Sequence, residues 1–174
     1  NAGETQLYFE AVQSAFSSVQ SGAQIFDSSD QHNKLLVNSL TATNILPKDG
    51  PHVSVIMTVY KHNELLESAI QSVLNQSHRN LELIIVDDCS PDDVYSFLEN
   101  IASTDDRIRV HRMKKNGGTY LAKNHGLGFA KGKYVAFHDS DDWLHPEKLE
   151  VSVGHLERND GCVAVFSNYF RVDE

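Results

Sequence analysis

Cysteine is scarce in this 174-residue chain, which contains only Cys89 and Cys162. Two cysteines are too few for a disulfide-stabilised scaffold, and they fit a protein that works in a reducing compartment. Cys89 follows a pair of aspartates, but we interpret it as a small residue tolerated there rather than a redox group. The nine histidines show neither His-x-x-x-His nor His-Glu-x-x-His spacing, so the sequence does not support a zinc site.

Long apolar runs are also lacking, since no segment approaches the roughly 20 residues that a membrane-spanning helix needs. The first residues have neither the basic region nor the apolar core of a signal peptide. Basic residues are also few: the chain has 15 Lys and Arg but 24 Asp and Glu, which gives a net charge of −9. This balance argues against nucleic acid as a partner. A phosphate-bearing ligand would need a metal ion or a local cationic pocket.

The first 50 residues predict a helical extension followed by a linker. Residues 4–20 form an amphipathic pattern, and we expect the apolar face to dock onto the main domain, onto another copy of the chain or onto a membrane surface. Its polar side has no Lys or Arg, which disfavours the membrane. A second, weaker helix is expected over 32–46. The Pro-Lys-Asp-Gly-Pro segment at 47–51 marks a boundary between an extension (1–50) and a domain (51–174).

Beyond this linker, strand and helix patterns alternate. Apolar, β-branched runs predict strands at 53–60, 81–88, 108–113, 134–137 and 162–170. Helical patterns lie between them, at 63–76, 90–101, 119–130 and 146–156. This alternation implies right-handed βαβ units and an α/β fold: a mainly parallel, doubly wound sheet with helices on both faces. The strand at 134–137 is expected to be buried.

Polar residues follow several of the predicted strands directly. Thr58 and Tyr60 end the first strand, Asp87 and Asp88 end the second, and an acidic segment at 139–142 follows the strand at 134–137. Because the carboxyl ends of parallel strands share one edge of a sheet, these residues should converge on one crevice, where ligands bind in such folds. The chemistry of the protein is therefore expected at this edge.

The acidic segment places Asp139, Asp141 and Asp142 within four positions. Carboxylates this close repel one another, and a hard divalent cation that completes its shell with substrate phosphates is a natural counter-charge. The alternative is a solvated acidic turn. We interpret His138, just before the segment, as a packed strand histidine, and the alternative is a residue that supports Asp139. The Asn-Gly-Gly loop at 116–118 opens a helix and should point backbone N–H groups at a phosphate.

Two other nucleotide- or phosphate-linked classes fit less well. A phosphorelay receiver domain also gathers carboxylates at strand ends, but its acidic pair follows the first strand and a lysine ends its last strand. In this sequence the pair follows the second strand, and the run at 162–170 ends in no lysine. A nicotinamide enzyme is disfavoured because no Gly-x-Gly-x-x-Gly fingerprint follows the first strand.

Four segments of the chain together resemble family 2 glycosyltransferases of the GT-A fold: Val53–Tyr60, Leu83–Ser90, Asn116–Gly126 and Asp139–Asp142. The resemblance runs from about His52 to the chain end, in the family's order and spacing. It implies a Rossmann-like nucleotide-binding domain that uses a nucleotide-diphosphate sugar, usually a UDP-sugar, as donor. It also implies a hexosyltransferase that inverts the anomeric carbon and acts on a glycan or lipid-linked acceptor.

By position, the resemblance implies that Thr58, Val59 and Tyr60 line the nucleoside pocket, with Tyr60 packed on the base. Asp88 would accept a hydrogen bond from uracil N3–H. The Gly117-Gly118 pair would bind the donor. Thr58 stands where the family often has proline, so the strand end is less constrained here.

The Asp139-Ser140-Asp141 segment matches the family's Asp-x-Asp (DxD) motif. The resemblance implies that Asp139 and Ser140 lie near the sugar nucleotide, and that Asp141, with Asp139, holds a Mn²⁺ or Mg²⁺ on the diphosphate. Lys123 stands where the family usually has Arg, and it offsets phosphate charge as a point cation rather than a bidentate fork.

The family's general base is an aspartate in a later segment, which we expect beyond Glu174. No catalytic residue is therefore assigned here: we expect the chain to be the donor-binding part, truncated before the acceptor segment, and to transfer sugar poorly or not at all by itself. A non-catalytic nucleotide-sugar-binding or interaction module on the same fold is the runner-up, and a hydrolase using the acidic edge is third. The leading hypothesis is bacterial, cytoplasmic polysaccharide biosynthesis, with peripheral attachment at the inner membrane face and self-association through the N-terminal helix as further options.

Overall fold

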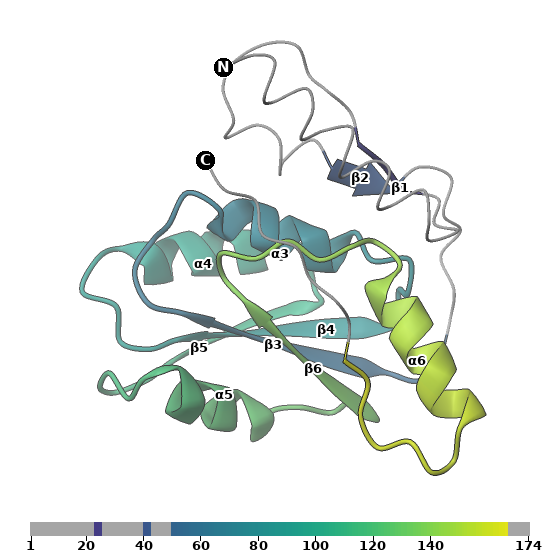
Figure 1. Cartoon of the computed structure of the whole chain (residues 1–174). Coiled ribbons are helices and arrows are strands. Elements are labelled where there is room, and N and C mark those ends of the chain that lie inside the picture. The colour runs from purple at the N-terminus through teal and green to yellow at the C-terminus, as the bar shows by residue number, and fades with distance from the viewer. Residues whose placement is uncertain (1–22, 26–39, 43–49, 167–174) are drawn as a thin grey trace, which may run out of the picture.

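The computed structural model describes residues 23–25, 40–42 and 50–166 (Figure 1). The first two segments form β1 (Ala23–Ile25) and β2 (Leu40–Ala42), which pair antiparallel. The expectation of a helix over 32–46 is therefore wrong at β2, because pairing with β1 overrides the apolar spacing. The helix expected over 4–20 lies outside the described residues.

Four parallel strands form the sheet of the main domain: β3 (Val53–Val59), β4 (Leu81–Asp87), β5 (Ile108–Arg112) and β6 (Tyr134–Asp139). Their order is β5-β4-β3-β6, with parallel register throughout (Figure 1). The two central strands, β3 and β4, are buried along almost their whole length, as their apolar sequences predict for doubly covered strands. The predicted α/β class with a parallel sheet is confirmed.

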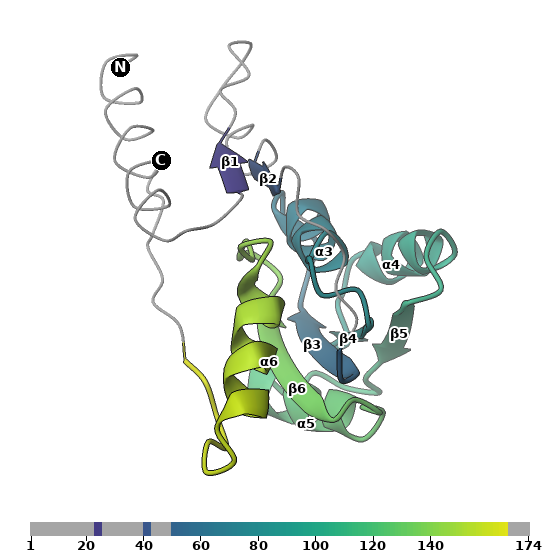
Figure 2. The same cartoon turned by 90° about the vertical axis from the view of Figure 1, so that its right-hand side faces the viewer.

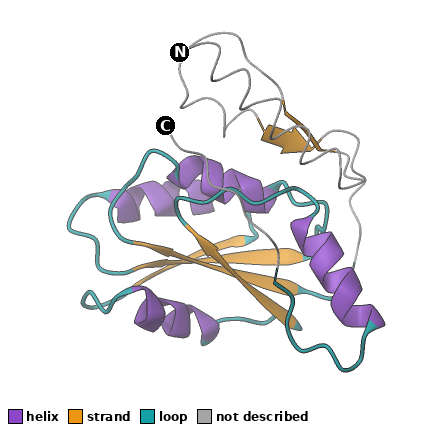
Figure 3. Ribbon diagram, viewed as in Figure 1, coloured by secondary structure: helices purple, strands orange, loops and turns teal. Residues whose placement is uncertain are grey.

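Helices cover both faces of this sheet. Those in the described part of the main domain are α3 (Leu66–Leu74), α4 (Val94–Ala102), α5 (Thr119–Leu127) and α6 (Lys148–Arg158). Figures 1 and 3 show α3 and α4 on one face and α5 on the other, and Figure 2 shows α6 alongside β6. None of the helices in the described residues is both long and apolar enough to cross a membrane.

The core has two layers because side chains alternate along each strand. Val55 and Met57 of β3 point to the face covered by α3 and α4, where Leu149 and Val153 of α6 also pack. Ile56 points to the opposite face and packs with Ile84, Val86 and Ala122 of α5. A Cβ added at Gly126 of α5 would lie 2.7 Å from Cγ2 of Ile56. This glycine therefore allows α5 to approach the sheet closely.

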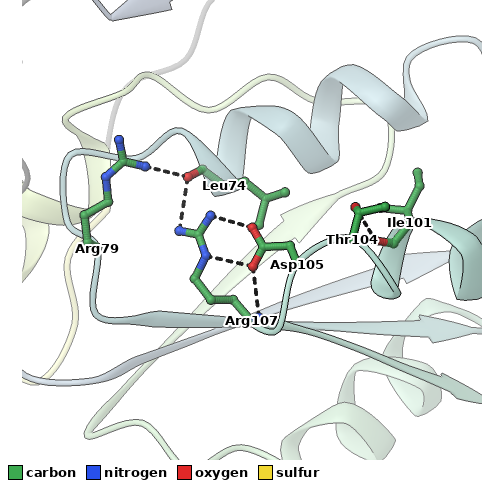
Figure 4. Close-up of polar contacts among 6 residues, drawn as sticks. All are labelled: Leu74, Arg79, Ile101, Thr104, Asp105 and Arg107. Atoms are coloured by element: carbon green, nitrogen blue, oxygen red, sulfur yellow. Dashed lines mark hydrogen bonds and ion pairs between the residues drawn. The ribbon is translucent and has the colours of Figure 1, made fainter.

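Two arginines satisfy the carboxyl end of α3, as Figure 4 shows. Arg79 and Arg107 each donate from Nη1 to the Leu74 carbonyl, at 3.0 and 3.2 Å. Arg107 is held in turn by the Asp105 carboxylate at 2.7 Å. Thr104 donates to the Ile101 carbonyl at the end of α4. The last carbonyls of a helix lack intrahelical hydrogen-bond donors. These side chains donate to two such carbonyls at the amino edge of the sheet.

Two details of the predicted strands are wrong. Residues 162–166 form no strand, and 167–170 lie outside the described residues. The strand at 134–137 is not buried throughout: Val135 is 40% and Phe137 51% exposed. Because β6 is an edge strand of the described sheet, one flank and part of one face are uncovered. Apolar composition alone does not distinguish an edge strand from a central one.

Candidate functional site

The strand ends meet at the carboxyl edge of the sheet, as the sequence predicts. The register pairs Thr58 of β3 with Asp139 of β6, and Val59 of β3 with Asp87 of β4. Side chains at paired positions of parallel strands point to the same face. Thr58 and Asp139 therefore share the face that α5 covers.

The amino-terminal half of α5 also faces this edge. The Thr58 and Thr119 hydroxyls are 3.0 Å apart. Lys123, one turn further along the helix, places Nζ 2.8 Å from Oδ1 of Asp139. The structure thus brings a helix start and a lysine against the first aspartate of the Asp-x-Asp motif. Thr119 is not among the residues predicted from the sequence, although its place at the start of the predicted helix was a usable signal.

The Asp88 carboxylate holds the glycine loop that precedes α5. Its Oδ1 accepts a hydrogen bond from the Gly117 amide at 2.8 Å, and its Oδ2 accepts one from the Gly118 amide at 2.7 Å. The sequence pattern predicts that the N–H groups of this loop face a phosphate. In the structure these two donate to Asp88 instead, because a buried carboxylate requires strong donors.

Asp87 has a different environment from its neighbour. It is fully buried, accepts the Ser90 amide at 2.9 Å and lies 3.1 Å from Nε of Arg112 on β5. The Ser90 hydroxyl in turn accepts the Lys61 amide at 2.9 Å. These contacts tie the ends of β3, β4 and β5 together. Asp87 therefore stabilises the edge, while Asp88 faces the loop.

The remaining residues predicted to bind the donor differ in exposure and in their contacts. Tyr60 is 51% exposed at the end of β3, with Nζ of Lys61 5.6 Å from its ring centroid. Its ring is available for stacking. Val59 is fully buried in the core and its carbonyl accepts the Asp88 amide, so its side chain contributes packing. The Ser140 hydroxyl accepts from Asn63 at 3.4 Å.

The acidic segment leaves its carboxylates exposed. Asp139, Asp141 and Asp142 all lie on the surface. Partial desolvation of the Asp142 carboxyl, together with the negative charges of Asp141 and Asp139, raises its pKa above the ordinary value. No group of three or more His, Cys, Asp or Glu residues in the described part of the chain is placed to hold a metal ion. Exposed carboxylates that crowd one another fit an ion whose shell is completed by phosphates and water.

His138, in β6 just before the acidic segment, packs against α3. It is buried, and its Nε2 lies 3.4 Å from the hydroxyl of Ser72 on α3. Burial lowers the pKa of His138 to about 4, so the ring is neutral at pH 7. The same hydroxyl accepts the Leu144 amide at 3.1 Å. The interpretation of His138 as a packed strand histidine is confirmed, whereas a lone serine within a helix gave no signal for Ser72.

Comparison with known proteins shows which family the chain belongs to. The model of the family described as "Glycosyl transferase family 2" matches residues 54–174. A putative teichuronic acid biosynthesis glycosyltransferase, TuaG of Bacillus subtilis, is 40% identical over 119 residues, 68% of this chain and 47% of that protein. Glycosyltransferase GlyG of Streptococcus pneumoniae is 33% identical over 122 residues, 70% of this chain and 40% of that protein. The chain thus spans less than half the length of these relatives.

Solved structures share the fold. Staphylococcus aureus TarS, residues 1–349 in complex with UDP-GlcNAc, has a TM-score of 0.56 and 27% identity over 62% of this chain and 31% of that one. The mannosyltransferase PcManGT of Pyrobaculum calidifontis, in complex with GDP-Man and Mn²⁺, has a TM-score of 0.52 and 27% identity over 58% of this chain and 30% of that one. The parallel sheet and these matches together establish that this chain belongs to glycosyl transferase family 2 and carries a GT-A-type fold.

Proposed function

We propose that this chain forms the donor site of an inverting glycosyltransferase that uses a UDP-sugar and a divalent cation. The observation that carries the proposal is the convergence of Thr58, Lys123 and Asp139 on one edge of the sheet, with Tyr60 exposed at the same strand end. A base can stack on an aromatic face, a diphosphate needs a cation, and a metal ion needs exposed carboxylates.

The nucleoside half of the site is assigned to the ends of β3 and β4. Tyr60 would stack on the base, Thr58 would lie along the nucleoside, and Asp88 would accept from uracil N3–H. A carboxylate oxygen can accept more than one hydrogen bond. Asp88 can therefore accept a further hydrogen bond in addition to those from the Gly117 and Gly118 amides. The TarS structure, solved with UDP-GlcNAc, supports a uridine donor, whereas the PcManGT structure was solved with GDP-Man.

The diphosphate half is assigned to Asp139, Ser140, Asp141 and Lys123. The two aspartates would hold Mn²⁺ or Mg²⁺ together with phosphate oxygens, and the PcManGT complex with Mn²⁺ supports a divalent ion. Such an ion acts as a Lewis acid that stabilises charge on the leaving phosphate. Lys123 would offset phosphate charge from the α5 side, where it already lies 2.8 Å from Asp139.

The reaction would transfer a hexosyl group to a glycan or lipid-linked acceptor. An acceptor hydroxyl oxygen would attack the anomeric carbon, the bond to the diphosphate would break, and the configuration would invert as the nucleotide leaves. The proton of that hydroxyl would pass to a general base, a role that we assign to none of the described residues. The similarity to TuaG supports polysaccharide biosynthesis, for which we propose a cytoplasmic location.

Calorimetric titration of the chain with UDP, with and without Mn²⁺, tests this proposal. GDP and ADP serve as controls for the base, and both are titrated at the same Mn²⁺ concentration. We expect UDP binding that requires Mn²⁺ and exceeds binding of GDP and ADP. Equal binding of all three nucleotides would contradict the uracil assignment. Binding of none would favour a scaffold or interaction module over a donor site.

A further inference from the structure

We propose that Asp88 is a positioning residue that fixes the start of α5, and with it Thr119 and Lys123, by clamping the amides of Gly117 and Gly118. This role is separate from any contact between Asp88 and a base. It rests on the proposed function only for its consequence, namely that loss of the clamp weakens binding of the diphosphate. The clamp itself can be measured without any ligand.

The carboxylate is itself held firmly. Asp88 is 3% exposed, and its own amide donates to the Val59 carbonyl at 2.9 Å, so the backbone that carries it is anchored to β3. Its two oxygens divide between two successive amides, at 2.8 Å for Gly117 and 2.7 Å for Gly118. Such charge-assisted bonds are shorter and stronger than those between neutral groups. A rigid strand end is thereby connected to a loop 29 and 30 residues away in sequence.

Gly118 needs this support because packing does not provide it. Its backbone has φ +81° and ψ 163°, a region that is open essentially to glycine alone. A Cβ added at Gly118 would have no heavy atom within 4 Å apart from those of its two chain neighbours, so no side chain from elsewhere packs against that side of the residue. The conformation is therefore maintained by hydrogen bonds, and Asp88 supplies the acceptor for the Gly118 amide.

The conformation of Gly118 determines where α5 begins. The Gly118 carbonyl accepts the Ala122 amide at 3.1 Å, in the first turn of the helix. Thr119 follows directly and meets Thr58, and Lys123 comes one turn later and meets Asp139. A loop freed from Asp88 would shift or fray this first turn. The cation and the helix start would then lose their alignment with the acidic segment.

Amide hydrogen exchange followed by NMR tests the clamp in the ligand-free chain. In Asp88→Asn one of the two amides faces an NH₂ donor instead of an oxygen. We expect exchange at Gly117, Gly118 and Ala122 to rise roughly tenfold to a hundredfold, the range for loss of a hydrogen bond to a charged group. Asp92→Asn is the matched control, since Asp92 also accepts a backbone amide, from His62 at 2.8 Å. Unchanged exchange at all three amides in Asp88→Asn would overturn the proposal.

A second variant changes the loop instead of the carboxylate, and it keeps the test decisive if Asp88→Asn does not fold. Gly118→Ala strains the backbone while leaving the carboxylate intact and meeting no steric obstacle. We expect the same faster exchange at Gly117 and Ala122. Where both variants fold, the double variant should exchange no faster than the single ones, because both remove one shared contact. Additive effects would show independent roles and overturn the clamp.

Ligand affinities distinguish a positioning role of Asp88 from a role in recognising the base. We would titrate UDP and inorganic pyrophosphate, each with Mn²⁺, into the wild type and Asp88→Asn. A positioning role predicts a similar fold-loss of affinity for both ligands and similar losses in Gly118→Ala. Loss for UDP alone would mean that Asp88 only contacts the base, and would overturn the inference. If the wild type binds neither ligand, the proposed function fails, and the exchange measurement alone decides on the clamp.

Discussion

Lys123 on α5 and Asp139 on β6 form an ion pair across the boundary between helix and sheet, with Nζ 2.8 Å from Oδ1. The same Nζ lies 5.8 Å from the centroid of the Phe137 ring. The pair matters because it places a cation beside a cluster of carboxylates that repel one another. It also couples the position of α5 directly to the Asp-x-Asp motif.

Replacing Lys123 should weaken donor binding through lost charge. We expect Lys123→Met to lower UDP affinity in the presence of Mn²⁺ by about tenfold or more, since a hydrogen bond to a charged group contributes about 1.5–3 kcal/mol. Lys123→Arg should retain most of the affinity because it keeps the cation. Calorimetry gives the comparison. Lys133→Met is the control, as Lys133 makes an exposed pair with Glu157 at the other end of β6. Equal affinities of Lys123→Met and wild type would contradict the assignment.

Asp141→Asn should abolish the dependence of UDP binding on Mn²⁺ while leaving the fold intact. The substitution removes a hard anionic ligand from an exposed position, so little stability should be lost. Titrations at several Mn²⁺ concentrations measure the dependence, and thermal unfolding checks the fold. Asp106→Asn, an exposed aspartate just before β5, provides the same change of charge at the opposite edge. An unchanged metal dependence in Asp141→Asn would mean that the cation lies elsewhere.

Glu82 should make the fold sensitive to acid. Its buried carboxylate accepts from Ser54 at 2.6 Å and from the Lys131 amide at 2.9 Å, and it lies 3.2 Å from Arg109. Burial raises the pKa of Glu82, but the two hydrogen bonds and the arginine lower it, and the balance lies below the ordinary value of 4.5.

Because the unfolded chain then binds the proton more readily, stability should fall as the pH drops below about 4.5 and toward the folded pKa. Glu82→Gln should cost about 1–3 kcal/mol at pH 7 and flatten this acid limb. Urea unfolding between pH 7 and pH 3.5 measures both effects. Glu67→Gln, on an exposed position of α3, should keep the wild-type pH profile. A Glu82→Gln profile parallel to the wild type would contradict the prediction.

Gly126→Ala should destabilise the domain even though alanine favours helices. The new Cβ would lie 2.7 Å from Cγ2 of Ile56, which is fully buried and cannot move aside freely. Overpacking of this kind costs about 1–3 kcal/mol. Gly161→Ala, which meets no atom within 4 Å, is the control. Urea unfolding of the two variants gives the difference, and equal stability would show that α5 can shift without cost.

The order of residues along the chain was sufficient to predict the architecture and the convergence of the polar strand ends on one edge of the sheet. Alternating apolar periods define βαβ units, and parallel strands must bring their carboxyl ends to one edge. Thr58, Asp88 and Asp139 could therefore be assigned to one edge from their positions at the ends of predicted strands. The family motifs, which occur in the expected order, indicated the same edge.

Contacts between distant segments determine how neighbouring residues divide their roles. Asp87 and Asp88 are adjacent, yet one pairs with Arg112 on β5 and the other with the amides of the Gly117-Gly118 loop. The exposure of Phe137 likewise follows from the edge position of β6, not from its apolar sequence. These outcomes depend on partners that folding brings in from elsewhere in the chain. A local sequence pattern determines the type of element and the face on which a side chain lies. It does not determine which hydrogen-bond donor or cation will contact that side chain.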